Sequence, residues 1–134
     1  MIVDGRVDHV GIAVEEIDRT LAVYTMLGFE KMEEETVASE GVRAVFLGGA
    51  GQTRVELLEP LHDESTLARF LSGRGPGLHH VAIRVKDIEA AVSTCEEEGL
   101  TISGAIRTGA LGRQVAFIHP RSTSGVLIEL VQDE

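Results

Sequence analysis

Hydrophobic and polar residues alternate along positions 7–14, which read VDHVGIAV. The branched residues Val10, Ile12 and Val14 fall on one side of an extended chain. His9 falls on the opposite side, among small residues. The pattern predicts a strand with one face suited to packing under a helix and a histidine on the more open face.

The same pattern returns later in the chain. Positions 78–85 read LHHVAIRV, so His80 aligns with His9 at an offset of 80 − 9 = 71. Phe117 aligns with Phe46 at the same offset. Self-similarity at a fixed offset is the signature of a repeated structural unit, but two copies are too few for a solenoid. We therefore predict a paired, pseudo-symmetric single domain.

Each copy is predicted to continue with a helix and three strands, as apolar periodicity, glycines and prolines indicate. In the first copy we expect a helix from Ile17 that ends at Gly28, strands at 29–32, 42–47 and 53–59, and a GGAG turn at 48–51. In the second copy we expect Asp87 to cap a helix that ends at Gly99, with strands at 101–105, 114–119 and 125–132 and a flexible turn at 108–112. A short helix at 64–71 joins the copies. The prediction is one α+β domain, 1–134, with modules at 5–60 and 78–132, each βαβββ, and a linker at 61–77.

Composition narrows the possible partners. Twelve basic and 22 acidic residues give a net charge of −10, which argues against nucleic acid or an anionic membrane as the main partner. No apolar run is long enough to span a bilayer, and residues 1–8 lack a signal-peptide pattern. The single Cys95 cannot form an intrachain disulfide, which fits a reducing cytoplasm, and we expect it to be a buried structural thiol.

Four side chains interrupt strand patterns at matching places in the two copies. His9 and His80 lie near the start of each copy's first strand, and Glu56 and Glu129 lie in the last strands. The glutamates are offset by 129 − 56 = 73, which a two-residue loop difference would absorb. A period of two places all four on the concave side of their sheet.

Paired imidazoles and carboxylates suit a divalent ion such as Co, Ni, Mn, Fe or Zn. A lone strand histidine is more often structural, but recurrence in register favours a metal site. The other histidines are weaker candidates. His79 aligns with Asp8, and both are expected to be supporting or surface groups. His62 is expected to be solvated, and His119 to be a turn residue or a substrate contact.

These residues resemble those of the vicinal oxygen chelate superfamily, and within it the methylmalonyl-CoA epimerase branch. The superfamily motif is only moderately specific, whereas HDESTLARFL and HPRSTSGVLIEL are more particular to that branch. The similar segments are DHVGIAV at 8–14, VELLEPLHDES at 55–65, GLHHVAIRV at 77–85 and FIHPRSTSGVLIELV at 117–131.

The resemblance implies a curved mixed sheet around a divalent ion, cobalt foremost and Ni, Mn or Zn as alternatives, held by His9, Glu56, His80 and Glu129. It also implies a homodimer, an acyl-CoA substrate and interconversion of the C2 epimers of methylmalonyl-CoA by proton abstraction through an enolate. Glu129 is the implied base on one side of the substrate.

The chain departs from the family pattern in two places. Ala44 stands where some members carry a glutamate proposed as a base, so Glu40 or a metal-bound water becomes the candidate second base. SGAIRTGALG at 103–112 replaces an Asp-Glu-Pro-like segment. Arginines such as Arg107, Arg113 and Arg121 are candidates for the CoA phosphates, although exposed ion pairs are the more ordinary interpretation of each.

Three other functions remain open. A glyoxalase I-type lactoylglutathione lyase uses the same ligand types and the same enolisation chemistry. A ring-cleaving dioxygenase needs only two His and one Glu, and Glu56 as a fourth ligand would crowd its oxygen site. A non-catalytic small-molecule-binding protein of the same fold generally lacks the full ligand set.

Overall fold

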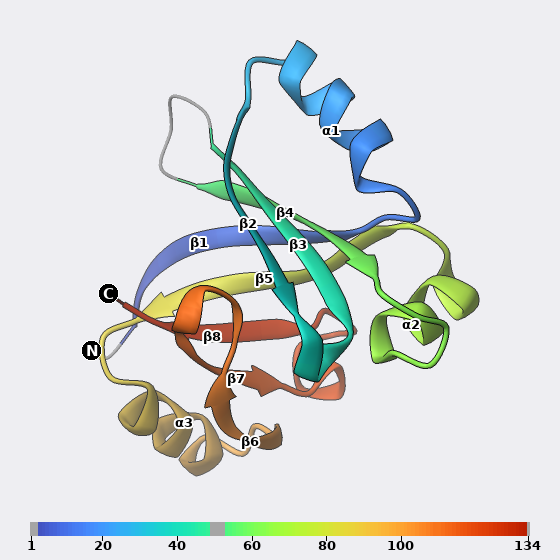
Figure 1. The fold of residues 1–134 in the computed structure, drawn as a ribbon. Helices are drawn as coiled ribbons and strands as arrows, with labels where there is room; N and C mark the ends of the chain where they lie inside the picture. The colour runs from blue at the N-terminus through green and yellow to red at the C-terminus, as the bar shows by residue number, and fades with distance from the viewer. Residues whose placement is uncertain (1–2, 49–52, 134) are drawn as a thin grey trace. The chain divides into compact units, whose positions relative to one another are not determined.

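The computed structural model describes residues 3–48 and 53–133 (Figure 1). The strands in these residues are β1 (Val3–Ala13), β2 (Glu30–Val37), β3 (Val42–Gly48), β4 (Arg54–Pro60), β5 (Gly77–Val85), β6 (Ile102–Thr108), β7 (Gln114–Ile118) and β8 (Ile128–Gln132). The helices are α1 (Ile17–Met26), α2 (Thr66–Arg74) and α3 (Ile88–Glu97), and short 3-10 turns cover Ala38–Glu40, Ala110–Gly112 and Pro120–Ser122.

The order of elements confirms the predicted α+β class and the two βαβββ modules, with α2 between them. Several predicted strands have different bounds; for example, β1 begins at Val3 and β6 continues to Thr108. β2 continues to Val37 because it pairs with β3 along its length, although its acidic sequence has no apolar alternation. β8 begins only at Ile128, because a 3-10 turn and a left-handed Ser124 precede it. The predicted GGAG turn at 48–51 lies mostly outside the described residues.

The chain divides into two compact units, Met1–His9 with His80–Glu134 and Val10–His79. In the first unit the strand order is β1-β5-β8-β7-β6, and β5 runs parallel to β8 while β7 is antiparallel to both neighbours. In Val10–His79 the order is β2-β3-β4-β1, with β3 antiparallel to β2 and β4. The parallel pair confirms a mixed sheet. The single-domain organisation stays a prediction.

In Val10–His79, α1 packs on β4 and β2. The core between them is formed by the apolar residues Val14, Ile17, Val45, Leu47 and Leu57. The carboxylate of Glu59, at the end of β4, accepts a hydrogen bond of 2.9 Å from the backbone N–H of Ile17. A side chain of the module's last strand therefore satisfies one of the donors that the start of a helix leaves open.

The unit that contains residues 80–134 repeats this arrangement. α3 packs on β6, β7 and β8 over a core that includes Val85, Ile88, Ala91, Ala116, Ile118 and Leu130. Gln132 at the end of β8 accepts a hydrogen bond of 2.8 Å from the backbone N–H of Ile88. Asp87 accepts one from the N–H of Ala90, as its position before the helix predicted.

Cys95 on α3 is half-buried against this core, and burial, followed by the negative charge of Glu96, raises the pKa of its thiol. Among the described residues, no helix is both long enough and apolar enough to cross a membrane.

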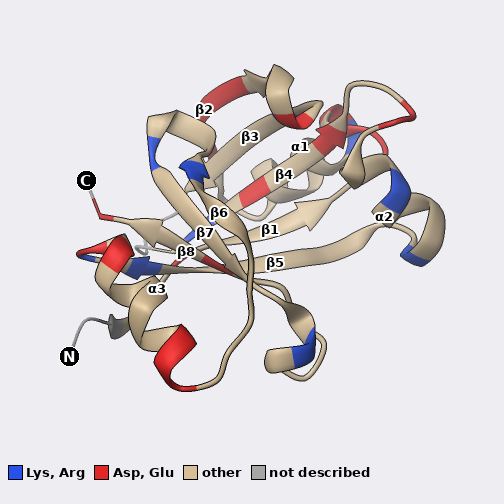
Figure 2. Ribbon diagram, turned by 90° about the horizontal axis from the view of Figure 1, so that it is seen from below, with Lys and Arg blue, Asp and Glu red and all other residues tan. Residues whose placement is uncertain are grey.

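Acidic residues are concentrated on β2, the edge strand of its unit, as the red segment of Figure 2 shows. Glu34 accepts hydrogen bonds from Arg43 on β3 and from Lys31, and these bonds lower its pKa to about 2. A charged edge strand discourages pairing with strands of other molecules.

Candidate metal centre

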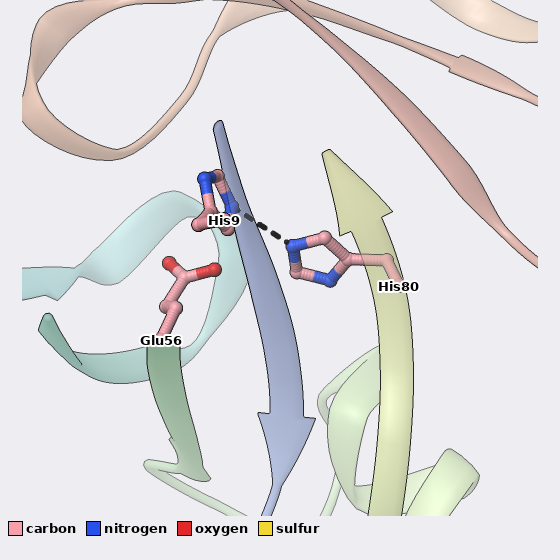
Figure 3. Close-up of side chains that lie close together, drawn as sticks. All are labelled: His9, Glu56 and His80. Carbon is pink, nitrogen blue, oxygen red and sulfur yellow. Dashed lines mark hydrogen bonds between the residues drawn. The ribbon is translucent and has the colours of Figure 1, made fainter. Parts of the chain in front are cut away.

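His9 on β1 and His80 on β5 meet in one unit. Each is only 4% exposed, and their rings pack edge to face with centroids 5.2 Å apart. The two Nε2 atoms are 3.2 Å apart, as the dashed line in Figure 3 marks. Both rings therefore point their outer nitrogens at the same place.

Glu129 on β8 reaches the same two nitrogens. Its Oε1 lies 3.2 Å from Nε2 of His9 and 3.9 Å from Nε2 of His80. The position follows from the parallel pairing, which sets Glu129 opposite Ala82, two residues along β5 from His80. Residues from three different strands thus bring two imidazoles and one carboxylate together within a single unit.

This set of donors fits a divalent ion. Ligands that share one ion at about 2.1 Å lie roughly 3.0–3.4 Å from each other, and the distances here run from 3.2 to 3.9 Å. Mixed imidazole and carboxylate ligands suit Zn, Co, Ni, Mn or Fe rather than Mg or Ca. The chemistry of the three residues therefore matches the kind of ion that the sequence predicted.

Asp8 lies directly behind His9. Its side chain is fully buried, and Oδ2 is 2.7 Å from Nδ1 of His9. Two arginines surround the same carboxylate: Arg113 approaches Oδ2, and Arg84 approaches Oδ1. The supporting role that the sequence suggested for Asp8 agrees with these contacts.

The arginines determine the charge of this carboxyl group. Burial alone would raise the pKa of Asp8, but hydrogen bonds from His9, Arg113 and Arg84 outweigh burial and hold it well below its usual range. Asp8 therefore stays ionised throughout the neutral range. A buried carboxylate with so many donors is a stable negative charge behind the histidine.

The remaining predicted site residues lie in Val10–His79. Glu56, the third residue labelled in Figure 3, is 4% exposed on β4, opposite Phe46 of β3. Glu40 ends the short 3-10 turn before β3 and is exposed. Ala44 is buried on β3 in an apolar cluster with Ala13, Leu58 and Leu67. The roles of Glu56 and Glu40 stay predictions.

Comparison with known proteins identifies the family of the chain. Residues 8–117 match the model of the glyoxalase/bleomycin resistance protein/dioxygenase superfamily. Human mitochondrial methylmalonyl-CoA epimerase is 38% identical over 96% of this chain and 74% of its own length. The chain belongs to the methylmalonyl-CoA epimerase family of this superfamily.

Two bacterial members of the epimerase family are also similar to the chain. An ethylmalonyl-CoA/methylmalonyl-CoA epimerase of Cereibacter sphaeroides is 38% identical over 96% of this chain and 98% of its own length. The crystal structure of methylmalonyl-CoA epimerase from Mycobacterium tuberculosis superposes with a TM-score of 0.92, at 35% identity, covering 99% of this chain and 90% of that one. The fold that the resemblance implied is thus the fold of a solved epimerase.

Sequence reasoning missed the importance of two arginines in this epimerase-family chain. Arg84 interrupts the apolar strand VAIRV, a signal that was available but not used. Arg113 was considered for substrate phosphates or for an exposed ion pair, and both interpretations are wrong because its side chain is buried against Asp8. Arg107 stacks on the ring of Phe117, 4.8 Å from its centroid, and Arg121 is exposed.

The other histidines are described by their own contacts and exposure. His79 packs its ring edge-on against Phe70 of α2, with centroids 4.8 Å apart. His119 accepts a hydrogen bond from the backbone N–H of Arg121, which supports the turn role. His62 is exposed, as predicted.

Proposed function

We propose that the chain interconverts the C2 epimers of methylmalonyl-CoA in a reaction that depends on a divalent ion. The observation that carries this proposal is the meeting of His9, His80 and Glu129 in a chain of the methylmalonyl-CoA epimerase family. Homologues along nearly the whole chain act on this CoA ester or on its ethylmalonyl counterpart, as their names state.

The residues proposed to hold the ion are His9, His80, Glu129 and, as the fourth ligand, Glu56. Support for Glu56 comes from its burial, from its carboxylate chemistry and from its place as the repeat counterpart of Glu129. A bound ion of this kind supplies Lewis acidity that polarises a carbonyl oxygen of the substrate. Cobalt is proposed first, with nickel, manganese and zinc as alternatives.

The chain's own carboxylates are proposed to move the proton. Glu129 is the base that takes the C2 proton on one face, and its side chain is 13% exposed. Epimerisation also requires delivery of a proton to the opposite face, hence a second acid–base group. Some family members carry a glutamate at the position where this chain has Ala44. Glu40 is proposed for that role because it is a carboxylate four residues before Ala44 in the sequence.

Hydrogen exchange at C2 tests the proposal. Cobalt-loaded protein is incubated with methylmalonyl-CoA in D₂O, and deuterium at C2 is followed by NMR or mass spectrometry. We expect rapid exchange that is lost after treatment with a chelator, and lost in His80→Ala. His62→Ala is the matched control, because it removes an exposed histidine and is expected to exchange like the wild type.

Failure of exchange in folded, cobalt-loaded protein would exclude the epimerase. The same preparation is then given the hemithioacetal of methylglyoxal and glutathione, the substrate of the rival lyase. Ethylmalonyl-CoA, compared in parallel, measures the preference for the acyl group. If Glu40 is the second base, Glu40→Gln with retained metal binding is expected to lose epimerisation of a single C2 epimer, while the epimer that Glu129 deprotonates still exchanges its C2 proton.

The homodimer and the cytoplasmic location are also proposals. They rest on the family resemblance and on the single cysteine, respectively. Light scattering on the purified protein measures the mass directly, and a mass near twice 14.4 kDa is expected.

A further inference from the structure

The carboxylate of Asp8 is surrounded by hydrogen-bond donors. Oδ1 accepts two bonds from Arg84, one from Nε at 3.1 Å and one from Nη2 at 2.8 Å. Oδ2 accepts one from Nη1 of Arg113 at 2.9 Å and faces Nδ1 of His9 at 2.7 Å. Two guanidinium groups bound to the carboxylate keep it ionised, so both of its oxygens act only as acceptors. Nδ1 of His9 must therefore be the donor of its bond.

This assignment determines where His9 keeps its lone pair. A neutral imidazole carries one N–H, so a proton on Nδ1 leaves the lone pair on Nε2. Nε2 is the atom that lies 3.2 Å from both Nε2 of His80 and Oε1 of Glu129. The neutral ring thus presents its lone pair to the other two candidate ligands, which is the form that binds a metal.

We infer that Asp8 is a positioning residue that selects this tautomer of His9 for metal binding, and that Arg113 and Arg84 act through Asp8. The inference rests on the metal site of the proposed function. Arg113 is held at both ends of its guanidinium, because Nε also donates to the backbone carbonyl of Gln132 at 3.1 Å. Its donor to Asp8 is therefore fixed in direction, and the carboxylate is fixed with it.

The repeat does not require this arrangement. The position that aligns with Asp8 in the second copy holds His79, whose ring packs against Phe70. The pair formed by Asp8 and Arg113, 105 residues apart, therefore occurs beside His9 and has no counterpart at the aligned position 79. The two histidines are expected to respond differently to changes behind them.

The test uses the full chain without metal and Asp8→Asn, which keeps the size of the side chain. Ring nitrogen shifts of His9 are measured by ¹⁵N NMR at a pH at which the imidazole is neutral. In the wild type we expect the proton on Nδ1. In Asp8→Asn we expect the Nε2-protonated form to rise, since an amide nitrogen beside Nδ1 is a donor. Affinity for Co²⁺, measured by calorimetry, is expected to fall about 10- to 100-fold.

Asp133→Asn is the matched control. Asp133 lies 3.8 Å from Nε of the same Arg84, so this change also turns an acid beside that arginine into an amide. The control is expected to keep both the tautomer and the affinity of the wild type. Arg113→Gln is expected to weaken Co²⁺ binding in the wild-type background but not in Asp8→Asn, because Arg113 acts through Asp8. Arg113→Lys should restore part of the affinity.

A wild-type His9 with its proton on Nε2 would overturn the inference, and so would an unchanged affinity in Asp8→Asn. If Asp8→Asn does not fold, the His9 tautomer and the Co²⁺ affinity are measured in Arg113→Gln instead, and they decide in the same way. If Arg113→Gln lowers the Co²⁺ affinity equally in the wild type and in Asp8→Asn, Arg113 has only a structural role and does not act through Asp8. These measurements need no substrate, so an absence of epimerase activity leaves them valid. A chain that binds no divalent ion refutes the proposed function, while NMR still decides the tautomer.

Discussion

Replacement of Gln132 by alanine tests how the start of α3 is anchored to β8. The side-chain amide makes two hydrogen bonds at the start of α3. Oε1 accepts from the N–H of Ile88 at 2.8 Å, and Nε2 donates to the carbonyl of Lys86 at 3.0 Å. Ile88 is the first residue of α3 and is only 4% exposed. The change therefore leaves a buried N–H without this partner, while the backbone carbonyl that binds Arg113 is unaffected.

The expected cost follows from two kinds of measurement. Loss of a helix cap costs about 0.5–2 kcal/mol, and an unsatisfied buried donor costs about 1–3 kcal/mol. Because Gln132 is half-buried and water can partly replace it, we expect about 1–2 kcal/mol for Gln132→Ala. An unfolding entropy of roughly 2.1 cal/mol/K per residue, applied to 134 residues, converts this loss into a fall in Tm of about 4–7 °C.

Calorimetry and urea unfolding of the metal-free chain measure the loss. Gln114→Ala is the matched control, because Gln114 makes an exposed hydrogen bond to Thr108 in the same unit, and it is expected to change stability by less than about 0.5 kcal/mol. Gln132→Glu keeps the acceptor and places a negative charge at the helix start, so it should lie closer to the wild type than alanine does. Equal, small effects of the two alanine variants would refute the capping argument.

Three further outcomes are expected. In a urea titration, Gly41→Ala should lower the free energy of unfolding by at least about 1 kcal/mol. Gly41 has φ +67°, and a Cβ there would lie 2.9 Å from Nε2 of His62. Gly73→Ala in α2, where a Cβ would meet nothing within 4 Å, is the control and should be neutral or stabilising. Co²⁺ at 100 times its Kd should stabilise the wild type by about 2.7 kcal/mol in thermal scans, and a similar gain in His80→Ala would contradict the metal site. Burial raises the pKa of Cys95, so at pH 8 a larger share of this thiol is protonated in the folded chain than in the unfolded chain. A disulfide reagent, followed by absorbance, should therefore react more slowly with folded than with urea-unfolded protein. Equal reaction rates would contradict the raised pKa.

Much of the fold was predictable because its signals are local. Alternation in VDHVGIAV and LHHVAIRV marks the strands that carry His9 and His80, and the 71-residue offset marks the two modules. Asp87 before an apolar stripe predicted the cap of α3, which the structure confirms. The strand period placed Glu129 on the face of the histidines, where it lies. Apart from the offset, which compares the two copies, each of these inferences needs only neighbouring residues and the regular geometry of strands and helices.

The partners of Asp8 were decided only by the tertiary structure. Arg84 and Arg113 meet Asp8 across 76 and 105 residues of chain, and no periodicity links positions so far apart. Sheet pairing selects such partners: it sets β8 parallel to β5, and Arg113 reaches the carbonyl of Gln132 at the end of β8. The sequence by itself predicted which residues are candidate metal ligands. The assembled sheet decided which charges stand behind His9, because a buried carboxylate takes whichever donors the neighbouring strands bring to it.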